Sequence, residues 1–146
     1  MKLEGTWSIV ADRVCVWEVL TDANVVAECI PGCEGMEPSG DDTYDATLSI
    51  GVGPVKGTYV GKVVMTDKVP PEQYKLIVKG ESRVGFVKGE GLIKLAEDGE
   101  CTVVTVDGDV QIGGTLASVG SRLIGVTAKM LMNKFFGAIE AKVKVA

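Results

Sequence analysis

A change of hydrophobic period late in the chain constrains the fold more than any other feature. Between Tyr44 and Ile112, apolar and polar residues alternate in short stretches that turn signals separate. This alternation predicts strands with one buried face, and the short connections predict an antiparallel meander. From about Leu116 to Val143 the period becomes helical. We therefore expect a long C-terminal helix that packs on the sheet, because neither element can bury its apolar face alone.

The start of the chain adds one strand and two short helices. Alternation up to Ile9 predicts a strand, and one helix follows Asp12 and ends near Thr21 and Asp22. A second helix runs from about Asn24 to Cys29, where a proline and a glycine stop it. The predicted fold class is α+β, with a curved antiparallel sheet of about six to seven strands around the long helix. A length of 146 residues suits a single domain over residues 1–146.

Small residues dominate the expected inward positions of the strands. The chain has 19 glycines but only two Trp, three Tyr and three Phe residues. The glycines can serve bulges and sheet curvature, or they can leave the interior open, and the two interpretations are compatible. A curved sheet with a helix across its mouth encloses a cavity unless large side chains fill it. The small inward set is Gly5, Ala46, Gly61, Gly80, Gly89, Gly91 and Gly108.

The composition excludes several chemistries. There is no histidine, so triads built on histidine and histidine-ligated zinc are ruled out. The four cysteines are expected to be reduced thiols, and we predict no metal site. The carboxylate pairs fall in turns or on polar strand faces, which argues against acid catalysis. A net charge of −5 argues against nucleic-acid binding. Without a signal peptide or an apolar run long enough to span a bilayer, we expect a cytoplasmic protein.

Charge is distributed unevenly along the chain. Residues 116–146 carry a net charge of +4, whereas residues 1–115 carry −9. A basic, apolar-rich terminal helix on an acidic body favours contact with an anionic surface, either a membrane or an acidic partner protein. The alternative is that the cations only complement the dipole at the C-terminal end of a long helix.

Several ordered motifs resemble one family. They are the Ile-Pro-Gly-Cys-Glu run at 30–34, the glycine-rich segments 53–61 and 85–89, the stretch 110–122 before the long helix, and the pair Phe135 and Phe136. Together they resemble the CoxG family, named for a component of carbon monoxide dehydrogenase, in the START-like (SRPBCC), helix-grip superfamily. The resemblance implies a long helix gripped by a curved sheet, with a hydrophobic ligand between them.

The resemblance also implies a function. Proteins of this kind are associated with molybdenum-containing carbon monoxide dehydrogenases and related hydroxylases, and are not the catalytic subunit. We expect a non-enzymatic accessory protein without a covalent cofactor that binds a quinone or lipid and aids membrane recruitment or electron transfer to the quinone pool. The predicted ligand-binding residues are Tyr59, Met65, Tyr74, Phe86, Leu123, Thr127, Met130 and Leu131.

A peripheral contact at the inner face of the cell membrane is expected at the basic end of the helix. Longer members of the family carry a C-terminal extension that can associate with the membrane, whereas this sequence ends at Ala146. The predicted membrane or partner contact residues are Lys134, Phe136, Lys142 and Lys144. Two other hypotheses stay open: a protein-docking or maturation module with a filled core, and a cyclase or hydratase enzyme of the same superfamily.

Overall fold

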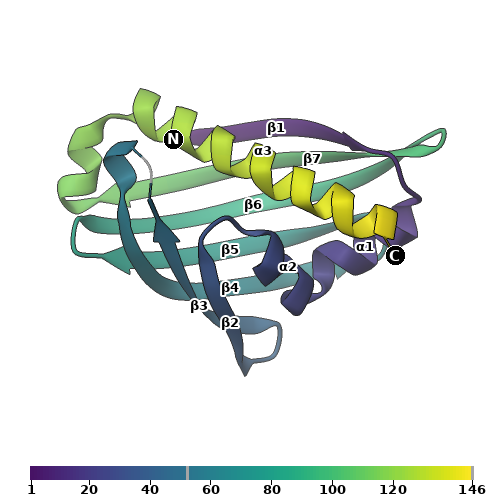
Figure 1. Ribbon diagram of the computed structural model, residues 1–146, viewed down its shortest axis with the longest axis horizontal. Helices are drawn as coiled ribbons and strands as arrows, with labels where there is room; N and C mark the ends of the chain where they lie inside the picture. The colour runs from purple at the N-terminus through teal and green to yellow at the C-terminus, as the bar shows by residue number, and fades with distance from the viewer. Residues whose placement is uncertain (52, 146) are drawn as a thin grey trace.

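In the computed structural model, seven strands form one antiparallel sheet in the order β1-β7-β6-β5-β4-β3-β2 (Figure 1). All neighbouring strands except β1 and β7 are consecutive in the chain, so the predicted meander is confirmed. The structure describes residues 1–51 and 53–145, without the side chains of residues 54, 144 and 145. The strands are β1 (Lys2–Ile9), β2 (Cys33–Gly40), β3 (Thr43–Ile50), β4 (Gly57–Val69), β5 (Gln73–Ser82), β6 (Gly85–Asp98) and β7 (Cys101–Gly113).

Three α-helices complete the fold. The helices α1 (Arg13–Thr21) and α2 (Ala23–Cys29) connect β1 to β2, and α3 (Ser121–Val145) ends the chain. The Asp22 carboxylate caps α2 by accepting hydrogen bonds from the backbone N–H groups of Asn24 and Val25. In Figure 1, α3 crosses the face of the sheet, and its C-terminal end lies beside α1. The expected α+β helix-grip architecture is therefore confirmed.

Two boundaries differ from the sequence prediction. The long helix begins at Ser121 rather than near Leu116, because residues Gly114–Val119 form the separate 3-10 helix η2. Gly120 divides the two segments with a φ of +94°, a conformation that an α-helix cannot contain. The strand β2 was not predicted as a separate element. It lies at the sheet edge with most of its second half exposed, so it lacks the alternation that identifies a strand.

The buried side chains form two clusters at opposite ends of α3. The larger cluster packs Phe136, Ile139 and Val143 from the second half of α3 against α1, α2 and the sheet. The smaller cluster joins Ile124 of α3 to Leu116 of η2 and to the region around the 3-10 helix η1 (Gly53–Val55). The second half of α3 is therefore fixed by a packed core, whereas fewer buried side chains support its first half.

Two inward glycines that face each other across β4 and β5 have different structural roles. A Cβ atom on Gly61 would lie 1.6 Å from the carbonyl oxygen of Lys79, so this position requires glycine for close approach of the two backbones. A Cβ atom on Gly80 would meet only the Cβ atom of Tyr59, at an ordinary 3.8 Å. Gly80 therefore fits the open-interior interpretation, whereas Gly61 allows a close approach of two backbones that neither interpretation predicted.

Candidate ligand-binding cavity

A cavity of about 380 Å³ lies between the first half of α3 and the sheet. Its helical wall consists of Ile124, Thr127, Ala128 and Leu131. These four residues have the spacing i, i+3, i+4 and i+7, which places them on one face of an α-helix. The volume lies at the small end of the range of about 300–1,000 Å³ that is common for small-molecule sites.

The rest of the wall comes from inward positions of the strands and from the segments that flank them. Gly61 and Gly80 contribute no side chain here, and this leaves room under the helix. The sheet is therefore the source of the empty space, as the small inward residues predicted. The apolar side chains of this wall come from Leu3, Ile30, Ala46, Leu48, Ile50, Val55, Val63, Val78, Val87, Val110, Ile112 and Leu116.

The hydroxyl groups of Tyr59 and Thr127 on the cavity wall are already hydrogen-bonded to the backbone. The hydroxyl of Tyr59 donates a hydrogen bond to the carbonyl of Val55 at 2.7 Å, and that of Thr127 donates to Leu123 at 3.0 Å. Lys62 and Lys79 lie beside the inward glycines, but both are exposed, and the Lys62 ammonium pairs with Asp45. Among the described residues that line the cavity, none is Asp or Glu. The arrangement suits an uncharged, mostly apolar molecule.

Three of the eight predicted ligand-binding residues line this cavity: Tyr59, Thr127 and Leu131. Two others belong to the packed core instead. Met65 and Tyr74 are 1% and 2% exposed and lie in the larger cluster, because their strand positions face α1 and α2 rather than the open part of the sheet. Whether any of the eight contacts a ligand stays a prediction.

The remaining three predicted residues lie outside the cavity. Phe86 is 38% exposed, and its ring covers Gly113 while the Lys88 ammonium lies 5.6 Å from the ring centroid. The next residue of β6, Val87, points inward in its place. Leu123 is 51% exposed, and Met130 lines a groove on the outer side of α3. Each of them precedes a cavity-facing residue, Ile124 or Leu131, by one position, which rotates it by about 100° around the helix.

Sequence reasoning missed two cavity residues on the helix and most of those on the strands. Ile124 and Ala128 could have been found, because with Thr127 and Leu131 they complete one helical face. Val87 could also have been found, since it shares the parity of the inward Gly89 and Gly91. The contribution of Val55 and Leu116 had no comparable signal, because both lie in 3-10 segments between regular elements.

The structure separates the four predicted membrane or partner contact residues. Lys134 is exposed on α3. Phe136 is only 4% exposed, so its prediction as a surface residue is wrong: its ring stacks on Trp7 at a centroid distance of 4.4 Å. Lys142 forms an ion pair with Glu28 of α2. The side chain of Lys144 lies outside the described residues.

None of the described groups with a shifted pKa lines the cavity. Burial raises the pKa of Tyr74, whose hydroxyl lies 3.3 Å from the carbonyl oxygen of Leu20, and also that of Cys29. Within the described part of the chain, no three Cys, Asp or Glu side chains are grouped as metal ligands. None of the described helices combines the length and hydropathy needed to cross a bilayer.

Solved structures with this architecture match nearly the whole chain. A START superfamily protein from Mycobacterium smegmatis has a TM-score of 0.75 at 16% identity, covering 98% of this chain and 97% of its own. The Zhui aromatase/cyclase from Streptomyces sp. R1128 has a TM-score of 0.68 at 16% identity, with coverage of 99% and 93%. The curved sheet and the long helix that crosses it are the fold of a START-like protein.

Closer similarity identifies the family. A conserved protein from Geobacillus kaustophilus is 37% identical, with a TM-score of 0.96 over 99% of this chain and 95% of that protein. Residues 5–144 match the family model of CoxG, a component of carbon monoxide dehydrogenase, and the chain belongs to this family. A search of curated proteins finds no match to the chain.

Proposed function

We propose that this protein is a non-catalytic accessory subunit that binds an apolar ligand in the cavity under α3. The observation that carries the proposal is the chemistry of the wall. It is almost entirely aliphatic, and the hydroxyls of Tyr59 and Thr127 are already hydrogen-bonded to backbone carbonyls. A ligand with strong polar or ionic groups would lose its hydration there without replacement partners.

The proposed ligand is an isoprenoid quinone or another lipid-like molecule. A volume of about 380 Å³ accommodates a ring system or a short chain, not a whole long-chain lipid. We infer that the ring or one chain segment enters the cavity while the rest of the ligand extends past α3. The proposed partner is a carbon monoxide dehydrogenase, as the family name suggests. We infer that this enzyme is of the molybdenum-containing kind, or a related hydroxylase. The protein would recruit that enzyme to the membrane or carry the quinone between them.

The cavity favours this proposal over the two alternatives. A docking module with a filled core would not need a space of about 380 Å³ lined by aliphatic side chains. An enzyme of the aromatase/cyclase kind would need a titratable group aimed at a substrate. The hydroxyl of Tyr59 on this cavity wall already donates to the carbonyl of Val55, and Tyr74 is buried in the larger cluster.

Mass spectrometry of an organic extract tests the proposal. The protein is purified without detergent, and the extract is searched for a stoichiometric quinone or lipid. Thr127→Trp fills the cavity and should abolish the signal, whereas Met130→Trp adds the same side chain to the outer side of α3 and should retain it. Purified wild-type protein is also incubated with menaquinone and ubiquinone analogues. An empty extract with no uptake of either analogue contradicts the proposal.

A further inference from the structure

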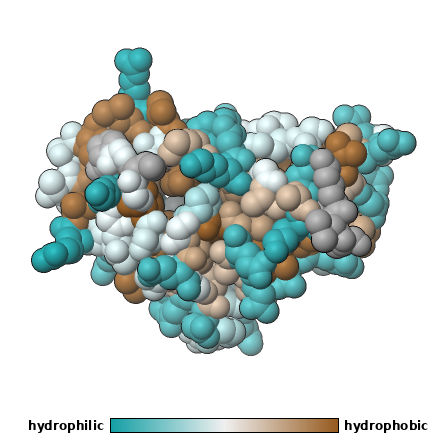
Figure 2. All heavy atoms as spheres, viewed as in Figure 1, coloured by the Kyte–Doolittle hydropathy of each residue, from teal (hydrophilic) through white to brown (hydrophobic). Residues whose placement is uncertain are grey.

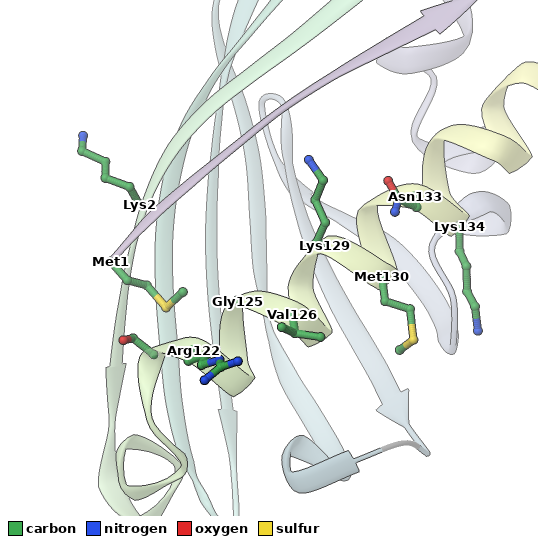
Figure 3. Close-up of a pocket in the computed structure, with 10 residues that line it drawn as sticks. Met1, Lys2, Arg122, Gly125, Val126, Lys129, Met130, Asn133 and Lys134 are labelled. Atoms are coloured by element: carbon green, nitrogen blue, oxygen red, sulfur yellow. The ribbon is translucent and has the colours of Figure 1, made fainter.

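The outer side of the first half of α3 forms a surface groove next to the start of β1. Arg122, Val126, Lys129 and Lys134 line it from the helix, and Met1 and Lys2 line it from the N-terminal end of β1 and the residue before it. Figure 3 shows Lys129 and Lys134 extending from opposite sides of the helix, with Val126 and Met130 between them. The helical period places Val126 roughly opposite Ile124 and Ala128, which face the cavity. One helix segment is thus the wall of the cavity and the floor of the groove.

Positive charge on this side of α3 is poorly compensated. No ion pair joins Arg122 or Lys134 to an acidic side chain in the part of the chain that the structure describes. The Lys129 ammonium lies 4.9 Å from the Trp7 ring centroid and donates to the carbonyl of Glu4, and neither partner carries a negative charge. Lys2 differs, because its ammonium lies 4.0 Å from Asp109. Three cations therefore face outward from an otherwise acidic protein.

Two of the most exposed large apolar side chains lie between these cations. Val126 is 64% exposed and Leu123 is 51% exposed. They are three residues apart and so lie on adjacent positions of the helix surface. Figure 2 shows hydrophobic residues gathered over the start of α3, at the upper left. Exposed aliphatic side chains framed by cations are typical of helices that lie in the interface of an anionic bilayer.

We propose that Arg122, Leu123, Val126, Lys129 and Lys134 form a docking face for the surface of an anionic lipid bilayer. The cations bind the headgroups while Leu123 and Val126 insert at the boundary with the acyl chains. An acidic protein would satisfy the cations equally well, but it would not explain the two aliphatic side chains between them. Docking brings the helical wall of the cavity to the bilayer, where an apolar ligand resides. The inference that docking lets the ligand pass from the bilayer into the cavity rests on the proposed function.

Vesicle co-sedimentation tests the docking face. Wild-type protein is mixed at low salt with vesicles of phosphatidylcholine alone or with a quarter phosphatidylglycerol. We expect binding only to the anionic vesicles, and a loss of roughly 30-fold in Arg122→Gln/Lys134→Gln, from two basic contacts near the surface. The matched control is Lys88→Gln/Lys94→Gln, which removes the same charge from exposed positions on β6 that do not line the cavity. It should lose much less affinity. Val126→Ser should also weaken binding while leaving the net charge unchanged.

Three results would overturn the docking face. The first is that wild-type protein does not bind anionic vesicles, and the second is that the two double variants lose the same vesicle affinity. The third is that the protein binds immobilised poly-glutamate but does not bind vesicles. The last result would indicate an acidic protein partner.

Equilibrium dialysis with a short-chain quinone separates this inference from the proposed function. Arg122→Gln/Lys134→Gln should bind the quinone in solution as the wild type does, because neither side chain lines the cavity. If wild-type protein binds no quinone while its vesicle binding still depends on Arg122 and Lys134, the docking face is supported and the proposed ligand is wrong.

Discussion

Trp7 of β1 connects the first strand to the last helix through two contacts of one side chain. Its indole Nε1 donates a hydrogen bond to Oδ1 of Asn133 over 2.9 Å, and its ring stacks on Phe136 with the centroids 4.4 Å apart. The same ring covers Gly5, where an added Cβ atom would lie 2.3 Å from it. These contacts hold the middle of α3 on the sheet, next to the half that covers the cavity.

The two contacts of Trp7 should differ in their contribution to stability. Phe136→Ala should lower the free energy of unfolding by about 3–5 kcal/mol, because it leaves a hole in the buried cluster. Asn133→Ala should cost about 1 kcal/mol or less, because its hydrogen bond lies at the surface, where water can replace it. Urea unfolding followed by circular dichroism measures both values. The reverse order of the two variants would show that α3 is held mainly by the hydrogen bond.

Stability at alkaline pH should depend on Tyr74. Burial raises its pKa in the folded protein above the ordinary value of 10.0, so the unfolded chain loses its phenolic proton first. Its contribution is fully present below about pH 10 and is lost as the pH rises toward the folded pKa, by about 1.4 kcal/mol per pH unit.

The variant Tyr74→Phe isolates this effect. It removes the proton and the contact with the Leu20 carbonyl, so it should be less stable than the wild type at pH 8. The difference between the two proteins should shrink above about pH 10 in urea titrations. A difference that stays constant over this range would show that the tyrosine ionises in the folded state as readily as in the unfolded chain.

Gly61 and Gly80 should respond in opposite ways to the same substitution. Gly61→Ala should destabilise the protein by more than about 3 kcal/mol, because its Cβ would overlap the Lys79 carbonyl oxygen. Gly80→Ala should change stability by less than about 1 kcal/mol, because its Cβ has room. Thermal unfolding of both variants provides the comparison. Gly80→Leu should additionally exclude the ligand, and an extract from this variant with an undiminished ligand signal would place the ligand elsewhere.

Lys142 should contribute little to vesicle binding, unlike Arg122. Its ion pair with Glu28 raises its pKa above the ordinary value of 10.5 and joins α3 to α2. Glu28→Gln should lower the pKa of Lys142, which NMR of the lysine side chain can follow. Lys142→Gln should bind anionic vesicles nearly as wild-type protein does, since an acidic partner already neutralises this charge. A loss as large as that of Arg122→Gln would extend the docking face to the end of the helix.

The fold followed from local patterns with few corrections. Alternation and turn signals marked most strands, and the change of period marked α3. The start of α3 was predicted too early because Gly120 has a positive φ, which interrupts helical geometry before Ser121. The hydrophobic period of a sequence does not reveal such an interruption. The strand β2 was missed because an exposed edge strand has no buried face to produce alternation.

The cavity could be predicted as a feature but not in its details. The small inward residues indicated open space, yet only three of eight chosen residues line it. Phe86 was chosen as a large aromatic residue although the parity of Gly89 and Gly91 already assigns it to the outer face. Met65 and Tyr74 have the correct parity, but they lie at the end of the sheet that α1 and α2 fill.

The sequence alone determined the element types, the antiparallel meander, the family resemblance and the segregation of charge toward the last helix. These depend on local period and composition, which the order of residues contains directly. Only the tertiary structure decided which end of the sheet is filled and which is open. It also decided that Phe136 is buried against Trp7 while Leu123 and Val126 are exposed. Such outcomes depend on contacts between residues far apart in the chain. The rotation of α3 about its own axis sets the exposure of all three of these helix residues at once.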